Sequence, residues 1–484
     1  MWRQTICLYL AAVNRKSKGL LGIVGVTITL RSNTGVIDMI LDRNSFGIWS
    51  FLAKRVFRAT FRRPNLSLDG YFGQNFAQRN VGIYIHIPFC TGRCSFCPYV
   101  KYMFERSFVR KYVKALKLEI EFYGKMLRNA ELRVVDIHAG GGTPSLLDAK
   151  DFYEIIEALN ENFEVSGQAR FGIEVNPEDF TAEKASEFAD SGIDEVSIGV
   201  QSFFTHNLKL LGRRHSVEDS LEAIENARNA GFKLINIDMM YMLPGQKLKE
   251  WISDIKIAVE QEVDEITIYP TLVTSYVPAY KMLKGEKIKE QPSKRTFKEM
   301  LYAAYEILKM EGYNPIEIYG FSRSNEKYAT VNLEMESPLL GFGAGAMGFT
   351  GYYEYQNTCS VREYVRSIYK KRHPIAGIRK VDKNEQAIRW ATCELFICRN
   401  LNLNKFKERF CEKFDKVIGE TSFGKALKFL KLLGIIKSDG NTIKLTEKRL
   451  FAANQLCWAF VLNVPCRITE EFLKTPWPIE VNIP

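Results

Sequence analysis

Three closely spaced cysteines carry the strongest chemical signal in this sequence. Cys90, Cys94 and Cys97 form a Cys-x3-Cys-x2-Cys pattern that directly follows an apolar run. Thiolates are the ligands of iron–sulfur clusters, and three thiolates leave one iron of a four-iron cluster open. An open coordination position is where a metal site accepts a substrate or cofactor. The alternatives are three buried structural thiols, or a zinc loop that lacks its fourth ligand.

The elements that must position this loop follow an alternating pattern. Six apolar, β-branched runs predict strands at 81–87, 132–138, 170–175, 195–200, 234–239 and 265–269. Helical periodicity occupies 107–127, 149–162, 182–191, 217–230 and 248–260. Such β-α steps predict an α/β fold with parallel strands and outer helices. Six units favour a partial (β/α)6 barrel of the TIM type, with chemistry at the carboxyl ends of its strands.

The chain outside the barrel divides into three further regions. Residues 1–80 form an N-terminal extension and 81–312 the barrel, whereas 313–382 are loop-rich and contain a glycine turn at 341–346. Residues 383–484 are expected to form a C-terminal domain and tail. In it, a helix at 425–433 and strands at 434–437 and 443–445 resemble a winged helix. Because this region has no stripe of basic residues, a packing or lid role is favoured over DNA binding.

The sequence motif around the cysteines resembles that of radical S-adenosylmethionine (SAM) enzymes. An aromatic residue, Phe96, precedes the last cysteine, and the segment Tyr84-Ile-His-Ile-Pro-Phe-Cys90 is similar to the branch named for oxygen-independent coproporphyrinogen III oxidase. That branch also includes haem chaperones, haem-degrading enzymes and two-SAM methyltransferases. The resemblance covers residues 81–460 and implies that Cys90, Cys94 and Cys97 bind a catalytic [4Fe–4S] cluster.

The resemblance also implies a set of SAM-binding residues, most of them at or beyond the ends of successive strands. A single acidic residue at a strand end would usually be a solvated loop residue, so the recurrence makes the set specific. The implied contacts are Tyr84, Phe96, Gly141, Gly142, Thr143, Glu174, Gln201, Arg213 and Asp238. This branch commonly holds a second SAM molecule, for which we expect Met240, Phe321 and the turn Gly343–Gly345 to lie nearby.

The resemblance further implies a mechanism. SAM would chelate the open iron, and one electron from a flavodoxin- or ferredoxin-like donor would cleave it to methionine and a 5′-deoxyadenosyl radical, which abstracts hydrogen from a C–H bond. The protein would place the cofactor and exclude solvent.

Several residues depart from the family pattern. The usual Tyr-Gly-Leu-Pro is replaced by Tyr241-Met242-Leu243-Pro244. The His-Asn-x-x-Tyr-Trp motif of the haem chaperones is missing, because no histidine lies between His215 and His373. We interpret His86 and His138 as packed or supporting residues rather than ligands. For Cys393, Cys398 and Cys411, buried thiols are favoured over an auxiliary cluster.

The positive charge is concentrated at the N-terminus. The net charge is +11, and residues 1–80 contain 12 of the 67 Lys and Arg residues but three of the 56 Asp and Glu residues. The nearly neutral body does not favour a nucleic-acid partner. Residues 46–63 predict a basic amphipathic helix that suits either an anionic membrane surface or docking on the barrel. Its apolar face would consist of Phe46, Ile48, Trp49, Leu52, Val56, Phe57 and Phe61, and its basic face of Lys54, Arg55, Arg58 and Arg62.

Three functional hypotheses follow. The first is a two-SAM radical enzyme that methylates, or forms a C–C bond on, a lipophilic or membrane-associated substrate, which the basic N-terminus motivates. The second is oxidative decarboxylation of a tetrapyrrole, as in coproporphyrinogen III oxidase. The third is a non-catalytic haem-handling protein, which the missing histidine motif disfavours. With no apolar run of about 20 residues and no signal-peptide pattern, we expect a cytoplasmic protein, or a peripheral one on the inner face of the membrane.

Overall fold

The computed structural model describes residues 59–65, 68–72, 76–92, 94–271, 273, 277–285, 287–289, 291–324, 328, 338–458 and 463–483. The chain divides into two compact units within these ranges. The barrel unit contains residues 58–386 together with 461–484, and the second unit contains 387–460. The tail after residue 460 therefore belongs to the barrel unit, not to the C-terminal domain in which the sequence placed it.

Six neighbouring parallel strands form the barrel wall and confirm the expected fold class. Their spatial order is β9-β8-β7-β6-β5-β2, and each is paired in parallel with the next. Strand β7 is buried along its whole length, as expected for a parallel strand covered on both faces. The bounds are β2 Asn80–Ile87, β5 Arg133–Gly141, β6 Glu164–Val175, β7 Glu195–Gln201, β8 Leu234–Tyr241 and β9 Glu265–Pro270.

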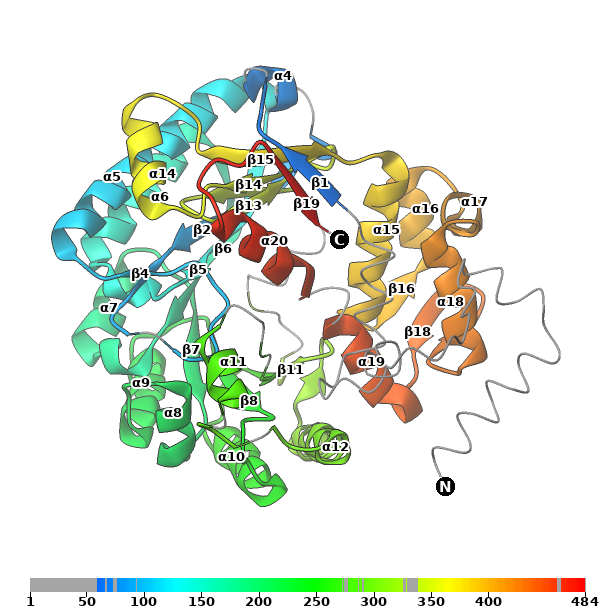
Figure 1. Cartoon of the computed structure of the whole chain (residues 1–484). Helices are drawn as coiled ribbons and strands as arrows, with labels where there is room; N and C mark the ends of the chain where they lie inside the picture. Colours follow the sequence, from blue (N-terminus) through cyan, green and yellow to red (C-terminus); the bar gives the residue numbers. More distant parts are fainter. Residues whose placement is uncertain are drawn as a thin grey trace. The chain divides into compact units, whose positions relative to one another are not determined.

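Helices on the outside of this wall match the sequence periodicity closely (Figure 1). The five predicted helices are α5 Arg106–Leu127, α6 Ala149–Asn162, α7 Ala182–Asp190, α9 Val217–Asn229 and α10 Leu248–Glu260. Capping boxes at Asp148 and Ser216 satisfy free backbone N–H groups where α6 and α9 begin. Three further helices complete this region, α8 Thr205–Leu211, α11 Pro278–Lys284 and α12 Lys294–Met310.

The sheet continues beyond both edges of the parallel wall. Strand β12 pairs in parallel with β2, and β13, β14 and β15 follow it antiparallel, so much of the region expected to be loop-rich is sheet. These strands are short and glycine-interrupted, which gives them a weak sequence signal. At the other edge, β11 and β10 extend from β9. The bounds are β10 Asn314–Pro315, β11 Gly320–Ser322, β12 Leu339–Phe342, β13 Met347–Phe349, β14 Tyr353–Asn357, α14 Val361–Tyr369 and β15 Ile375–Lys380.

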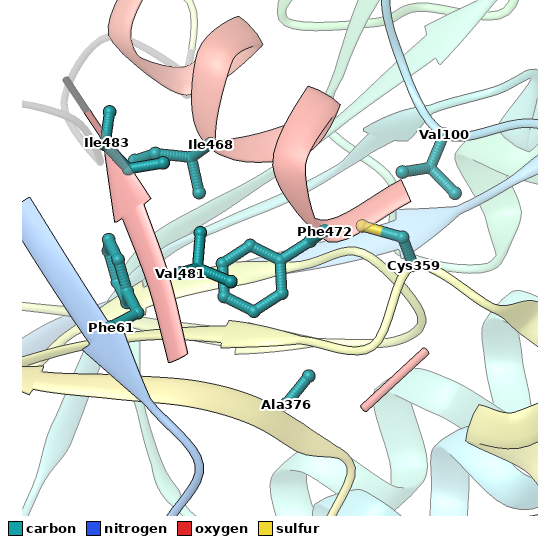
Figure 2. Packing of buried hydrophobic residues seen from close by; sticks show 8 residues of the cluster. All are labelled: Phe61, Val100, Cys359, Ala376, Ile468, Phe472, Val481 and Ile483. Carbon is teal, nitrogen blue, oxygen red and sulfur yellow. The ribbon is translucent and has the colours of Figure 1, made fainter. Parts of the chain in front are cut away.

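The two ends of the described chain meet at the far edge of the sheet. Strand β1 (Ala59–Arg62) pairs antiparallel with β15 and with β19 (Glu480–Ile483), close to helix α20 (Asn463–Leu473) and the short α4 (Leu68–Phe72). Phe61 and Arg62 therefore lie in a strand, not in the expected amphipathic helix, because Phe61 enters the core cluster of Figure 2. The rest of that predicted helix, 46–58, lies outside the described residues.

The second unit has the expected winged-helix-like pattern. Strands β16, β18 and β17 form a three-stranded antiparallel sheet beside α18. Cys411 is exposed rather than buried, while Cys393 and Cys398 are partly buried. No helix in the described part of the chain is long and apolar enough to cross a membrane. The bounds are α15 Lys383–Phe396, β16 Asn400–Asn402, α16 Leu403–Phe410, α17 Phe414–Ile418, α18 Ser422–Leu432, β17 Ile436–Ser438, β18 Thr442–Leu445 and α19 Leu450–Cys457.

Candidate active site

The cysteine loop lies at the carboxyl end of β2. Cys90 ends the short strand β3 (Phe89–Cys90), which pairs in parallel with β4 (Tyr102–Met103) on the far side of the loop. Lys101 Nζ lies 3.2 Å from the carbonyl oxygen of Cys94 and 3.3 Å from that of Cys97, and donates to both. These contacts close the loop on itself, with the three sulfur-bearing residues partly buried.

The three cysteines are of the ligand type that iron–sulfur clusters use. Burial raises the pKa of Cys90 to about 11 and also raises the pKa of Cys97, and the neighbouring cysteines add to both shifts. A bound metal centre reverses this preference, because coordination deprotonates a thiol. Among the described residues, no three His, Cys, Asp or Glu side chains are placed to hold a single metal ion. Ligands of a four-iron cluster bind separate irons and therefore stand further apart.

A glycine segment at the end of β5 faces the cysteine loop. Gly141 has φ +108°, and a Cβ there would overlap the His86 ring, so this position requires glycine. The N–H groups of Gly142 and Thr143 donate to the carbonyls of Ile87 and Phe89, at 2.8 and 2.7 Å. The Thr143 hydroxyl lies 3.7 Å from Cys90 Sγ. The segment Gly141–Thr143, whose residues are implied SAM contacts, therefore lies directly beside the cysteine loop.

Glu174 presents a charged carboxylate at the end of β6. Its Oε2 accepts from Gly141 N–H at 3.1 Å, and its Oε1 lies 3.3 Å from His138 Nε2. Desolvation works to raise the pKa of Glu174, but these contacts outweigh it and hold the pKa below its ordinary value. His138 is buried between the rings of Tyr84, stacked at 5.9 Å, and Tyr328, at 5.3 Å. Such a carboxylate suits an ammonium group of a ligand.

Asn176 connects two of the predicted SAM residues and was missed by the sequence analysis as a functional residue. Its Nδ2 donates to Thr143 Oγ1 at 3.1 Å, and its Oδ1 accepts from Arg213 Nη1 at 2.8 Å. Gln201 lies near the same guanidinium, because a Cβ on Gly199 would touch both side chains. Gln201 itself has φ +70°, a rare conformation for a residue with a side chain. The only sequence signal for Asn176 was its position two residues after Glu174.

Asp238 lies on β8 and faces the same interior. Its Oδ1 accepts from Asn236 Nδ2 at 3.1 Å. Burial raises the pKa of Asp238 to about 7, and the Glu174 carboxylate adds to the increase. Hydroxyl groups of a ligand that donate to this carboxyl group would stabilise its charged form, because they would replace the hydration lost on burial.

The remaining predicted residues divide between the site and the core. Phe96 is buried in an apolar cluster, against which Met240 packs. Phe321 is fully buried on β11, and its ring meets Tyr305 of α12 edge-to-face at 5.4 Å, so it packs against the outer helix layer. Met242, which replaces the family's glycine, is buried with φ +64°, a conformation that favours glycine.

His86 is a supporting residue, in agreement with the sequence interpretation. It is buried, and burial lowers its pKa to about 4, so the ring is neutral. Its Nδ1 lies 2.9 Å from Tyr84 Oη, and its Nε2 lies 3.3 Å from the carbonyl oxygen of Val100. A neutral ring that donates from Nε2 to Val100 accepts the tyrosine proton at Nδ1. The ring thus connects β2 to the end of the cysteine loop.

The glycine turn Gly343–Gly345 is held against β2 by side chains of α5. Glu119 Oε2 accepts from Gly343 N–H at 2.8 Å, and the Tyr112 hydroxyl accepts from Ala344 N–H at 2.9 Å. The same hydroxyl donates to the carbonyl oxygen of His86 at 2.7 Å. Gly345 lies against Val100, since a Cβ on it would overlap that side chain. The turn therefore lies against Val100, three residues after the last cysteine of the loop.

Comparisons with known proteins agree with this geometry. Residues 84–258 match the model of the radical SAM superfamily, whose members use a [4Fe–4S] cluster and SAM. The haem chaperone HemW of Bacillus subtilis is 28% identical over 380 residues, which cover 78% of this chain and 98% of the relative. The oxygen-independent coproporphyrinogen III oxidase of Bradyrhizobium diazoefficiens is 24% identical and covers 79% of this chain and 87% of its own.

A solved structure confirms the fold. Coproporphyrinogen III oxidase (HemN) from Escherichia coli superposes with a TM-score of 0.71 at 23% identity, over 83% of this chain and 94% of that structure. Residues 84–258 are therefore a radical SAM domain, and the chain is homologous to the haem chaperones HemW and the oxygen-independent coproporphyrinogen III oxidases.

Proposed function

We propose that this protein is a radical SAM enzyme that abstracts hydrogen from a tetrapyrrole substrate, in the manner of an oxygen-independent coproporphyrinogen III oxidase. The observation that carries the proposal is the junction of the cysteine loop with the segment Gly141–Thr143, where Thr143 contacts Cys90. Support for a tetrapyrrole comes from the two homologous groups, which are named for coproporphyrinogen and haem.

Within this proposal, each group of residues has a distinct task. Cys90, Cys94 and Cys97 would hold the cluster, which supplies one electron to SAM and thereby the radical that removes a hydrogen atom. Glu174, held charged by His138 and Gly141, would bind the ammonium group of SAM. Asp238 would accept hydroxyl protons of the ribose. Asn176 would fix Arg213 beside Thr143, and the buried aromatic residues would exclude water.

Methyl transfer, or C–C bond formation on a lipophilic substrate, is the second candidate. The observation that motivates it is that the turn Gly343–Gly345, expected near a second SAM molecule, packs against Val100, three residues after Cys97. Met240, also expected near that molecule, packs against the apolar cluster that contains Phe96 of the cysteine loop. Stoichiometric haem binding without SAM cleavage would instead be the activity of a haem chaperone.

Product analysis separates these functions. The protein is reconstituted anaerobically with iron and sulfide, reduced with dithionite, and given SAM with coproporphyrinogen III and an electron acceptor, or with a lipid extract. We expect 5′-deoxyadenosine together with CO2 release from the porphyrinogen. S-adenosylhomocysteine with a methylated product would favour methyl transfer, and absence of both SAM products would refute radical chemistry.

A matched pair of cysteine variants tests the cluster ligands. Cys90→Ala should lose the brown cluster absorbance and all 5′-deoxyadenosine formation. Cys411→Ala should keep both, because Cys411 is exposed and lies outside the site. A full [4Fe–4S] content in Cys90→Ala would refute the ligand assignment.

A further inference from the structure

A basic surface beside the cysteine loop has no part in the site described above. Helix α5 and the end of α14 contribute six exposed cations to it: Arg110, Lys111, Lys114, Lys370, Lys371 and Arg372. None of the six forms an ion pair with another residue in the part of the chain that the structure describes. From residue 106 to residue 118, α5 contains five Arg and Lys residues and no acidic residue. We refer to these six residues as the α5–α14 surface.

The two helices lie side by side, so their cations belong to one surface (Figure 1). The rings of Tyr112 and Tyr364 lie 5.1 Å apart. The Tyr369 hydroxyl donates to the carbonyl oxygen of Lys111 at 3.5 Å. Tyr364 also donates to Glu119 of α5 at 2.6 Å. These contacts hold the two helices together beneath the six cations.

The α5–α14 surface adjoins a proposed cluster ligand. The N–H of Phe104 donates to the carbonyl oxygen of Cys90 at 3.0 Å, and α5 begins two residues later. With a rise of about 1.5 Å per residue, Lys114 lies roughly 12 Å along the helix from its first residue. Arg362 of α14 donates to the Tyr102 hydroxyl of strand β4 at 2.8 Å, so α14 also contacts the strand that follows the cysteine loop. Met103 next to Tyr102 is 47% exposed.

We propose that the α5–α14 surface docks an acidic one-electron donor protein of the flavodoxin or ferredoxin class. The inference rests on the proposed function, because only a reductively activated site needs such a partner. Unpaired cations favour an acidic partner and accelerate its encounter, and their position brings the donor to the Cys90 side of the loop. For flavodoxin, the flavin hydroquinone loses one electron and becomes the semiquinone, while the cluster gains that electron.

Charge-reversed variants test the docking site. The two double variants are R110E/K114E on α5 and K370E/K371E after α14. The matched control is K249E/K256E on α10, which reverses two exposed lysines that form no ion pair with any described residue. Anaerobic stopped-flow mixing of the reconstituted enzyme with flavodoxin hydroquinone gives the rate of cluster reduction. Circular dichroism verifies that each variant is folded.

We expect the rate of cluster reduction to fall in the two test variants but not in the control, and to do so only at low salt. At low salt, each test variant should be reduced about 10-fold more slowly than the control, within the range that electrostatic steering contributes. The difference should largely vanish near 0.5 M salt, because the screening length then falls to a few ångströms. Equal rates in all variants at low salt would overturn the proposal. The proposal would also be overturned if the test variants bound anionic vesicles more weakly but kept the wild-type rate of cluster reduction by flavodoxin. That result would assign the surface to lipid binding.

A second reductant separates this proposal from the proposed function. Dithionite is a small molecule that needs no docking surface, so all variants should cleave SAM equally well with it. If the wild-type enzyme fails to cleave SAM with dithionite, the proposed function fails. If it cleaves SAM with dithionite but the variants keep the wild-type flavodoxin rate, only the docking proposal fails.

Discussion

At the residue scale, the site depends on side chains that fix other side chains. Asn176 uses both ends of its amide, so that Thr143 and Arg213 share one hydrogen-bonded partner. Glu174 and Gly141 form a similar pair across β5 and β6. Such contacts hold ligand-binding groups in one orientation before a ligand arrives, which lowers the entropy lost on binding.

Removing the Asn176 amide should weaken SAM binding without affecting the cluster. Asn176→Ala leaves Arg213 without its acceptor, and a hydrogen bond to a charged group contributes about 1.5–3 kcal/mol. We expect SAM affinity to fall roughly 10- to 100-fold, as measured by equilibrium binding under anaerobic conditions, with iron content unchanged. Asn160→Ala, on the exposed side of α6, serves as the control. Unchanged affinity in Asn176→Ala would mean that Arg213 does not act on SAM.

At the element scale, helix α5 holds the turn between β12 and β13 through a buried carboxyl group. Glu119 is fully buried and accepts from Gly343 N–H, Tyr364 Oη and Asn357 Nδ2. Burial raises its pKa to about 7, although these three donors work to lower it. The helix, the turn and α14 are therefore joined by a group that titrates near neutral pH.

The raised pKa of Glu119 predicts a pH-dependent stability. Between its ordinary value of 4.5 and about 7, the folded protein retains a proton that the unfolded chain has released. Stability therefore falls as pH rises through this window, by up to about 1.4 kcal/mol per pH unit, and the loss is complete above it. Glu119→Gln cannot titrate, so its unfolding free energy should fall less steeply between pH 5 and 7.

Chemical denaturation at several pH values measures this difference. Other buried carboxyl groups titrate in the same window, and subtracting the variant from the wild type isolates Glu119. Glu121→Gln, two residues further along α5 and partly exposed, should retain the wild-type slope. Parallel curves for the wild type and Glu119→Gln would contradict the prediction.

At the scale of the barrel unit, the two ends of the described chain pack in one core cluster with a residue that follows the cysteine loop. The cluster in Figure 2 brings together Phe61 of β1, Phe472 of α20, Val481 of β19 and Val100, three residues after Cys97. Phe61 and Phe472 meet edge-to-face at 5.8 Å. Val100 also accepts from His86, so the packing of the chain ends is connected to the interior of the site.

Phe472→Ala should destabilise the barrel unit and loosen the cysteine loop together. Deleting a fully buried phenylalanine typically costs about 3–5 kcal/mol, which chemical denaturation would detect. Because Val100 belongs to the same core cluster, we also expect the reconstituted cluster to decay faster in air. Phe429→Ala removes a ring that is 43% exposed on α18 and should change stability by about 0.5 kcal/mol or less. A wild-type decay rate in Phe472→Ala would show that the loop is not braced in this way.

The elements of the barrel and the cysteine pattern at its centre could be predicted from the sequence alone. Strand and helix patterns are local, so the six parallel strands and the five outer helices could be predicted within a few residues. Cys90, Cys94 and Cys97 lie in one loop, and the order of parallel strands brings Gly141, Glu174 and Asp238 to the same edge. Short spacing and periodicity suffice for the strands, the helices and the shared edge, because these need no knowledge of distant contacts. The SAM-binding roles of these residues are what the family resemblance implies.

The way in which distant segments support that centre could not be predicted, because it depends on tertiary contacts. The contact between Glu119 and Gly343 spans 224 residues, and that between Thr60 and Asn482 spans 422. No local pattern specifies such partners, since they depend on which strand edges and buried groups remain to be satisfied after the barrel forms. For the same reason, Phe61 was expected in an amphipathic helix but pairs in a strand, where the free edge of β15 and the ring of Phe472 complete its burial.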